Sequence, residues 1–299
     1  MPAGAYTPLF IYLLILIAFL WVCRVLNYSV VASILGALFL VMAPINLKRG
    51  ALGGFGTDPY NILFPLLLLG CLFLALRPAS KKNGYLWAVI FGLTLSVYAL
   101  FCQGWGLLFF MGVACALGAA AYNFFIKKDP PHARQNLLFL ILFIGTTLLM
   151  LSIRKFTHRG PDLWPNLFMS VGELKKTSLG SITTSVGGPV FMLLVFGGWS
   201  YSLRMALKNF RQARIDTLIL TIFLIVTMSL SLKGEQFVPF ATIPLSILAA
   251  AAAHRFIGLR SVGLPLAGLL IALILFNANR DIRTVLTPIP AAPALKYFK

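Results

Sequence analysis

Long apolar runs separated by short polar breaks follow one another along this chain, and they limit its possible folds more than any other feature. Of its 299 residues, 60% are hydrophobic and only 11% are charged, and the mean hydropathy is +0.92. A soluble domain does not need so much apolar side chain, whereas a chain that crosses a lipid bilayer many times does. The sequence therefore predicts an all-α, polytopic helical membrane protein.

The apolar runs predict about ten transmembrane helices, because most of them are close to the length that a bilayer requires, although the run 8–22 is short for a span. The predicted helices cover roughly 8–22, 28–46, 60–76, 85–102, 105–126, 136–153, 187–203, 216–232, 237–254 and 262–277. Prolines inside or near their ends predict kinks at Pro44, Pro65, Pro239 and Pro244. We expect one transmembrane domain over residues 1–299, with polar external loops at 47–59 and 154–186.

Basic residues concentrate in every second loop, which predicts the orientation of the chain. These loops carry Arg24, Arg77, Lys81, Lys82, Lys127, Lys128, Arg134, Arg204, Lys208, Arg211, Arg214, Arg255 and Arg260. The short loops between them carry only Lys48, Arg49 and Lys233. Basic loops stay in the cytoplasm, so we expect both termini and the loops 47–59 and 154–186 on the external face. The net charge of +18 follows from this topology, and we expect no nucleic-acid partner.

The loop 47–59 is a candidate binding site. It contains a basic pair, Lys48 and Arg49, then glycines, then Asp58, one of only seven acidic residues in the chain. A carboxylate beside basic side chains at the mouth of a helix bundle is suited to a divalent cation or a phosphate. An Asp-Pro pair also begins many helices, so Asp58 is equally compatible with a capping role for the helix 60–76.

The loop 154–186 holds a second candidate, Glu173. Loops of this length in compact proteins are typically functional, although residue type alone favours a solvated glutamate beside Lys175 and Lys176. Asp58 and Glu173 together would supply carboxylates from two external segments, which is the donor type that Mg²⁺ and Mn²⁺ prefer. Arg49 and Lys233 add positive charge suited to a phosphate or diphosphate.

Three segments, in order, resemble the catalytic subunit of oligosaccharyltransferase in its single-subunit bacterial and archaeal form. Arg49 followed by Gly53-Gly54-Phe55-Gly56-Thr57-Asp58 is similar to a motif that ends in Asp-x-Asp, with Gly56 at the first acidic position. Ser170-Val171-Gly172-Glu173 resembles a Ser/Thr-Val/Ile-x-Glu motif of the mobile external loop. Lys233-Gly234-Glu235-Gln236-Phe237 is similar to the segment that holds a phosphate-binding arginine, with Gln236 at that position. The chain resembles the central transmembrane part of such an enzyme.

This resemblance implies a GT-C fold and a membrane glycosyltransferase. The family moves a glycan from a polyprenyl-phosphate or polyprenyl-diphosphate carrier to asparagine in Asn-x-Ser/Thr of an acceptor polypeptide. By resemblance, Asp58 and Glu173 are catalytic and metal-binding residues, with Mn²⁺ or Mg²⁺ as the cofactor. Arg49, Lys233 and Gln236 are expected to bind the carrier phosphate. The expected partners are the polyprenyl-linked glycan donor, the acceptor polypeptide and the lipid bilayer.

Two alternatives remain open on the sequence. A related GT-C transferase with another acceptor is compatible with Gly56 and Gln236. It also fits the expectation that the family's soluble C-terminal domain, with its Trp-Trp-Asp motif, is absent after Lys299. A non-catalytic protein that binds or transports polyprenyl-linked glycans is the other alternative. For the same reasons, full activity is not expected of this chain alone.

Overall fold

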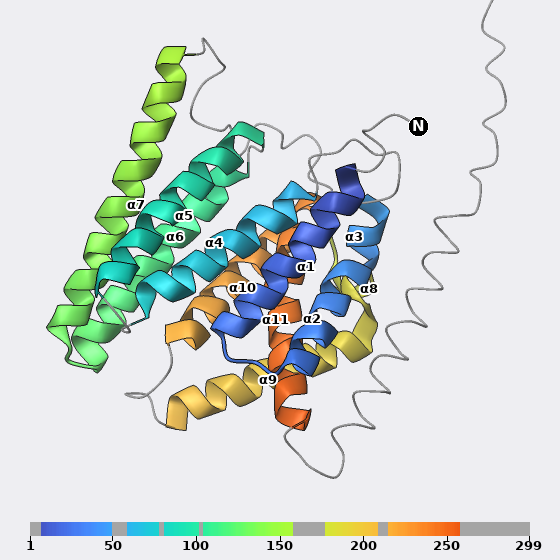
Figure 1. The fold of residues 1–299 in the computed structure, drawn as a ribbon. Helices are drawn as coiled ribbons and strands as arrows, with labels where there is room; N and C mark the ends of the chain where they lie inside the picture. The colour runs from blue at the N-terminus through green and yellow to red at the C-terminus, as the bar shows by residue number, and fades with distance from the viewer. Residues whose placement is uncertain are drawn as a thin grey trace, which may run out of the picture.

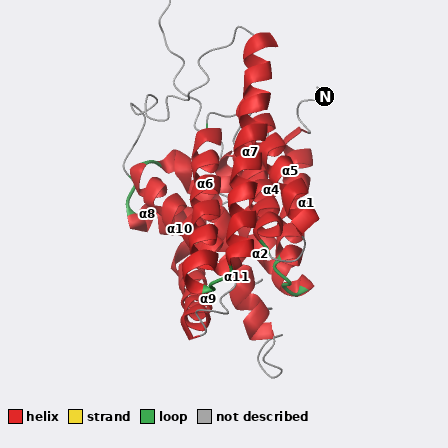
Figure 2. Cartoon of the chain, turned by 90° about the vertical axis from the view of Figure 1, so that its left-hand side faces the viewer, coloured by secondary structure: helices red, strands yellow, loops and turns green. Residues whose placement is uncertain are grey.

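The chain forms a bundle of helices (Figure 1). The computed structural model describes residues 7–49, 59–77, 81–101, 104–157, 177–208 and 215–257, and all regular secondary structure in these ranges is helical (Figure 2). The elements are α1 (Thr7–Val25), α2 (Val30–Met42), α3 (Pro44–Arg49), α4 (Tyr60–Leu76), α5 (Lys81–Phe101), α6 (Trp105–Ala121), the π-helix η2 (Tyr122–Ile126), α7 (Pro130–Thr157), α8 (Leu179–Val186), α9 (Gly188–Lys208), α10 (Ile215–Lys233), the 3₁₀-helix η5 (Glu235–Phe237) and α11 (Val238–Ile257).

The first nine predicted ranges coincide with helices, and the tenth, 262–277, lies outside the described residues. The range 28–46 divides at Ala43, because Pro44 has no backbone N–H and begins a new helix. At Pro65 and Pro244 the helices continue as α4 and α11. The expected loop 154–186 is partly helical, since α7 extends to Thr157 and α8 forms near its end.

Four of the described helical stretches are long and apolar enough to cross a membrane: Trp105–Ile126, Pro130–Ser152, Ile215–Lys233 and Glu235–Ile257. A fifth span results if α8 and α9, bent by 98° where they meet, form one broken span. Four shorter apolar helices accompany them: Phe10–Val25, Val30–Met42, Tyr60–Leu76 and Gly84–Leu100. The chain is thus a multi-pass integral membrane protein, and the number of ten spans stays a prediction.

Helix α11 lies at the centre of the bundle, and 89% of the most apolar 18-residue stretch of Glu235–Ile257 is buried. Its run of small residues, Ala249–Ala253, lets neighbouring helices approach closely, as is common between membrane helices. A side chain added at Gly36 of α2 would place its Cβ 2.7 Å from Ala250 Cβ. A Cβ at Gly198 of α9 would lie 2.7 Å from Leu248 O. Only glycine fits at these two contacts, so α2 and α9 pack directly on α11.

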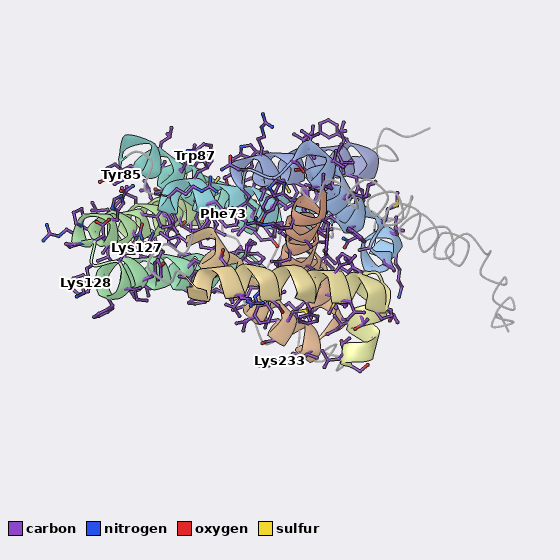
Figure 3. The ribbon with its side chains drawn as sticks, turned by 90° about the horizontal axis from the view of Figure 1, so that it is seen from below. Phe73, Tyr85, Trp87, Lys127, Lys128 and Lys233 are labelled. Carbon is purple, nitrogen blue, oxygen red and sulfur yellow. The ribbon has the colours of Figure 1, made fainter. Side chains whose placement is uncertain are left out.

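The helices run in alternating directions, so their ends gather at two opposite ends of the bundle (Figure 1). We call one the basic end; here Ser29 N donates to His254 Nδ1 at 3.1 Å, and Arg77 pairs with Asp216. We call the other the site end; it holds α3, α8, η5 and the start of α4. Lys127 and Lys128 lie together, apart from Lys233 (Figure 3).

Candidate functional site

Helix α3 carries the first predicted phosphate-binding residue, Arg49, as its last residue. The helix is held by Asn46, which is 1% exposed. Tyr12 Oη of α1 donates to Asn46 O at 2.8 Å, and Asn46 Nδ2 donates to Thr242 Oγ1 of α11 at 3.3 Å. These hydrogen bonds fix the backbone that leads to Arg49 against two other helices.

The turn between α10 and α11 carries the other two predicted phosphate-binding residues, Lys233 and Gln236. Lys233 is the last residue of α10 and is exposed, in a position where the carbonyl end of the helix favours a cation. Gly234 N donates to Leu230 O at 3.1 Å and then leads into η5, where Gln236 is half-buried. Lys233 and Gln236 therefore lie in one turn at the site end.

The segment that follows Glu173 returns to the same turn. Thr177 N donates to Leu232 O at 3.4 Å, directly beside Lys233. Ser178 Oγ then accepts from Ser181 N at 3.1 Å and caps α8. The buried face of α8 packs in one apolar cluster with the α2–α3 segment and α11, through Ile182, Val186, Ala43, Ile45, Val238 and Ala241.

The segment that follows Asp58 also reaches the start of α11. Pro59 is buried, and Tyr98 Oη of α5 donates to Asn61 Oδ1 of α4 at 2.6 Å. A Cβ added at Gly104 would lie 3.0 Å from Tyr98 Oη and 3.3 Å from Phe240 Cζ. Tyr98 and Gly104 therefore link Asn61 in the first turn of α4 to Phe240 in the first turn of α11.

The structure thus brings together α3, the turn with Lys233 and Gln236, and the described residues that follow Asp58 and Glu173. Asp58 and Glu173 themselves lie outside the described residues. Within the described ranges, no group of three or more His, Cys, Asp or Glu side chains is placed to hold a metal ion. The assignment of all five site residues remains a prediction.

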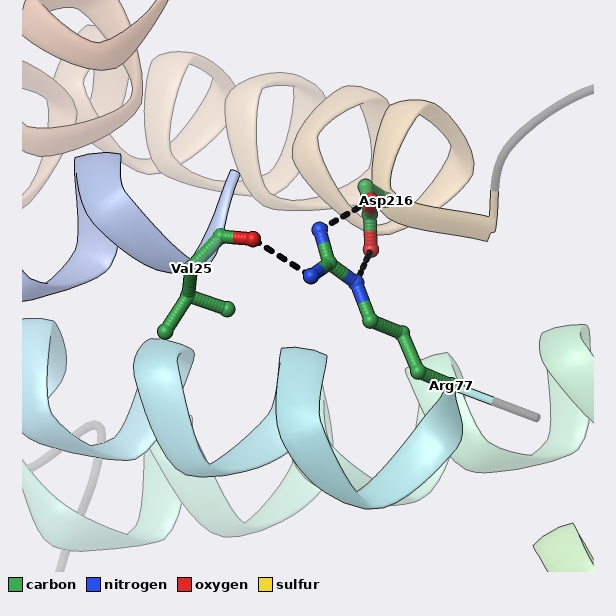
Figure 4. Close-up of polar contacts among 3 residues, drawn as sticks. All are labelled: Val25, Arg77 and Asp216. Atoms are coloured by element: carbon green, nitrogen blue, oxygen red, sulfur yellow. Dashed lines mark hydrogen bonds and ion pairs between the residues drawn. The ribbon is translucent and has the colours of Figure 1, made fainter. Parts of the chain in front are cut away.

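Two features of the structure were not found from the sequence. The first is Asn46, which is buried. Its position as a polar residue inside the apolar range 28–46, two residues after Pro44, is the sequence signal that could have identified it. Arg77 lies in one of the basic loops expected in the cytoplasm, but its separation of 139 residues from Asp216 gave no sign that the two would pair. In the structure the two form an ion pair at the basic end (Figure 4).

Comparison with known proteins supports the resemblance seen in the sequence. A dolichyl-phosphooligosaccharide-protein glycotransferase of Methanocaldococcus jannaschii is 30% identical over 155 residues. That alignment covers 45% of this chain and 16% of the relative. No protein-family model matches the sequence.

Solved structures of the archaeal oligosaccharyltransferase AglB from Archaeoglobus fulgidus have a similar fold. The complex of that protein with an inhibitory peptide and a dolichol-phosphate aligns with a TM-score of 0.66 and 14% identity, over 94% of this chain and 44% of the other. A complex of the Archaeoglobus fulgidus oligosaccharyltransferase with Zn and sulfate aligns with a TM-score of 0.62 and 16% identity, over 93% of this chain and 41% of the other.

This chain has an oligosaccharyltransferase-like fold. The prediction of an all-helical membrane protein of the GT-C type is confirmed, and so is the resemblance to the oligosaccharyltransferases. The chain spans less than half the length of the relatives it matches.

Proposed function

We propose that this chain is the membrane part of an oligosaccharyltransferase-type glycosyltransferase. The enzyme moves a glycan from a polyprenyl-phosphate or polyprenyl-diphosphate carrier to asparagine of an acceptor polypeptide. One observation carries the proposal: the helix that ends in Arg49, the turn with Lys233 and Gln236, and the residues after Asp58 and Glu173 meet at one end of α11. The aligned relative is a glycotransferase that uses a dolichyl-linked oligosaccharide.

In this proposal Asp58 and Glu173 hold a divalent cation, Mn²⁺ or Mg²⁺. Carboxylate oxygens fit such hard cations, and the aligned archaeal enzyme forms a complex with Zn. Glu173 precedes Thr177 by four residues, and a fully extended chain covers at most about 3.5 Å per residue. Thr177 N in turn donates to Leu232 O, beside Lys233. A divalent cation held by Asp58 and Glu173 would supply positive charge opposite the charge that develops at the acceptor amide and the leaving group.

The positive residues of the site end take the carrier phosphate. Lys233 is exposed, Gln236 offers an amide N–H in the same turn, and Arg49 ends α3. Arginine and lysine side chains suit phosphate oxygens, arginine through paired N–H donors. The aligned archaeal enzyme has been solved with a dolichol-phosphate.

We further propose that residues 1–299 form a single transmembrane domain whose site end is external. The support is the charge distribution, since the basic end holds Arg24, Arg77 and Arg255. By the positive-inside rule that end is cytoplasmic. Both termini and the loops 47–59 and 154–186 are then external.

Glycan transfer tests the proposal directly. The protein is expressed from its own full reading frame, and transfer from a polyprenyl-diphosphate oligosaccharide to a labelled Asn-x-Thr peptide is measured with Mn²⁺ or Mg²⁺. Asp58→Ala and Glu173→Ala are expected to lower transfer by more than about 100-fold, and a chelator to abolish it. Asp162→Ala, in the same predicted loop as Glu173, serves as the matched control and should retain transfer.

Transfer that persists in both Asp58→Ala and Glu173→Ala rejects the assigned roles. Transfer to other acceptors but not to the asparagine peptide supports the GT-C transferase with a different acceptor. Carrier binding without transfer and without dependence on a divalent cation supports the binding or transport protein.

A further inference from the structure

The break between α2 and α3 leaves the last backbone carbonyls of α2 without their helical donors, and Leu40 O is one of them. In a continuous helix Leu40 O would accept from the backbone N–H of residue 44, but Pro44 has none. Ala43 adopts φ −57° and ψ 128°, which ends α2. Asn46 Nδ2 donates to Leu40 O at 2.6 Å and so replaces the missing donor.

The second N–H of the same amide ties the break to α11. Asn46 Nδ2 donates to Thr242 Oγ1 at 3.3 Å, and the Thr242 hydroxyl donates in turn to Pro239 O at 2.6 Å. Both N–H groups of the Asn46 amide are therefore used, and each hydroxyl or amide donor has a distinct acceptor. Together with the bond from Tyr12 to Asn46 O, one buried residue connects α3 to α1, α2 and α11.

Helix α3 depends on such anchoring, because six residues are far too few for a helix that is stable alone. Asn46 N and Leu47 N both donate to Ala43 O, at 2.9 and 3.0 Å, so the first turn is built directly on the break. Ile45 supplies the buried apolar contact, while Lys48 is exposed at the far end. The polar bonds of Asn46 decide the direction in which the cationic end of α3 leaves the bundle.

We propose that Asn46 is a positioning residue that holds the Lys48–Arg49 end of α3 in place for the carrier phosphate. The role of the positioned cations rests on the proposed function, whereas the tether itself rests on the contacts around Asn46. Asn46 does not touch the carrier. It acts through the backbone of α3.

The test compares two variants that cut the tether with two that do not. Asn46→Ala removes the amide, and Thr242→Val removes its α11 partner at almost unchanged volume, which serves if Asn46→Ala does not fold. Thr242→Ser keeps the hydroxyl. Ser246→Ala removes the next hydroxyl along α11, which is 1% exposed and has no hydrogen-bond partner among the described residues.

Hydrogen exchange and carrier kinetics are measured on the full protein. Asn46→Ala and Thr242→Val are expected to lower the protection of the amides at 45–49 about tenfold, with the amides at 33–40 unchanged. The KM for the polyprenyl-diphosphate glycan should rise about tenfold, while kcat and the KM for the acceptor peptide stay the same. Thr242→Ser and Ser246→Ala should match the wild type in both measurements.

Unchanged protection at 45–49 in both tether variants overturns the proposal. Lost protection with an unchanged carrier KM in an active enzyme also overturns it, because the tether would then be structural only. If the wild type neither binds the carrier nor transfers the glycan, while protection still falls in the tether variants, the proposed function fails and the tether stands.

Discussion

The ion pair between Arg77 and Asp216 joins α4 to α10 at the basic end, and its removal has a calculable effect. Arg77 Nε donates to Asp216 Oδ1 at 3.2 Å and Nη2 donates to Oδ2 at 2.7 Å. Arg77 Nη1 also donates to Val25 O (Figure 4). The side chains of Arg77 and Asp216 are 23% and 10% exposed. One guanidinium therefore joins the ends of α1, α4 and α10.

Asp216→Ala leaves the Arg77 charge partly buried with one neutral acceptor. Removing one partner of a fully buried pair costs about 3–5 kcal/mol. Arg77 retains some contact with solvent, so we expect a loss of about 2–3 kcal/mol in the free energy of unfolding. For a protein of this size that corresponds to a fall in Tm of about 3–5 °C. The double variant Arg77→Met/Asp216→Leu leaves no unpaired charge and is expected to recover most of the loss.

The native cysteines provide the assay. Cys23, Cys71 and Cys115 are buried and lie on α1, α4 and α6, so a thiol-reactive fluorophore added in detergent reports their exposure on heating. Arg77→Lys keeps the charge but loses the paired donors, and it should fall between the wild type and Asp216→Ala. A Tm for Asp216→Ala equal to that of the wild type would refute the reasoning. A loss in the double variant that equals the summed losses of Arg77→Met alone and Asp216→Leu alone would also refute it.

Two further predictions concern the basic end and the orientation. Desolvation raises the pKa of the Asp129 carboxyl, but hydrogen bonds from the backbone and ring of His132, with the charges of His132 and Lys127, lower it overall below its usual 3.8. Because the folded-state pKa is lower than the unfolded one, ionised Asp129 stabilises the folded state at pH values above 3.8. This stabilisation is lost as the pH falls through the folded-state pKa. Asp129→Asn should therefore lower Tm near about pH 5 and have no effect in strong acid; an equal effect at both would contradict this. For orientation, a membrane-impermeant thiol reagent on intact cells should label Lys48→Cys but not Arg24→Cys, and the reverse pattern would place the site end in the cytoplasm.

The apolar runs determined the helices of this protein, because a backbone in a bilayer must satisfy its hydrogen bonds within each segment. Pro44 likewise marked the break between α2 and α3, since it lacks a donor. The alternation of basic loops anticipated the two ends of the bundle. Each of these features depends on residues close in sequence. The motifs for Arg49, Lys233 and Gln236 were also local, and their place at the site end follows from the helix order.

Only the tertiary structure decided which of these segments meet. Helix α8 lies in an expected loop, because eight residues with two buried positions, Ile182 and Val186, give too short a pattern to identify. Asn46 and Thr242 are 196 residues apart, and no local pattern names such a partner. The small residues of α11 allow close packing, but only the folded bundle shows that α2 and α9 occupy that space. Partner choice depends on the packing of the whole bundle, whereas a sequence pattern describes one segment at a time.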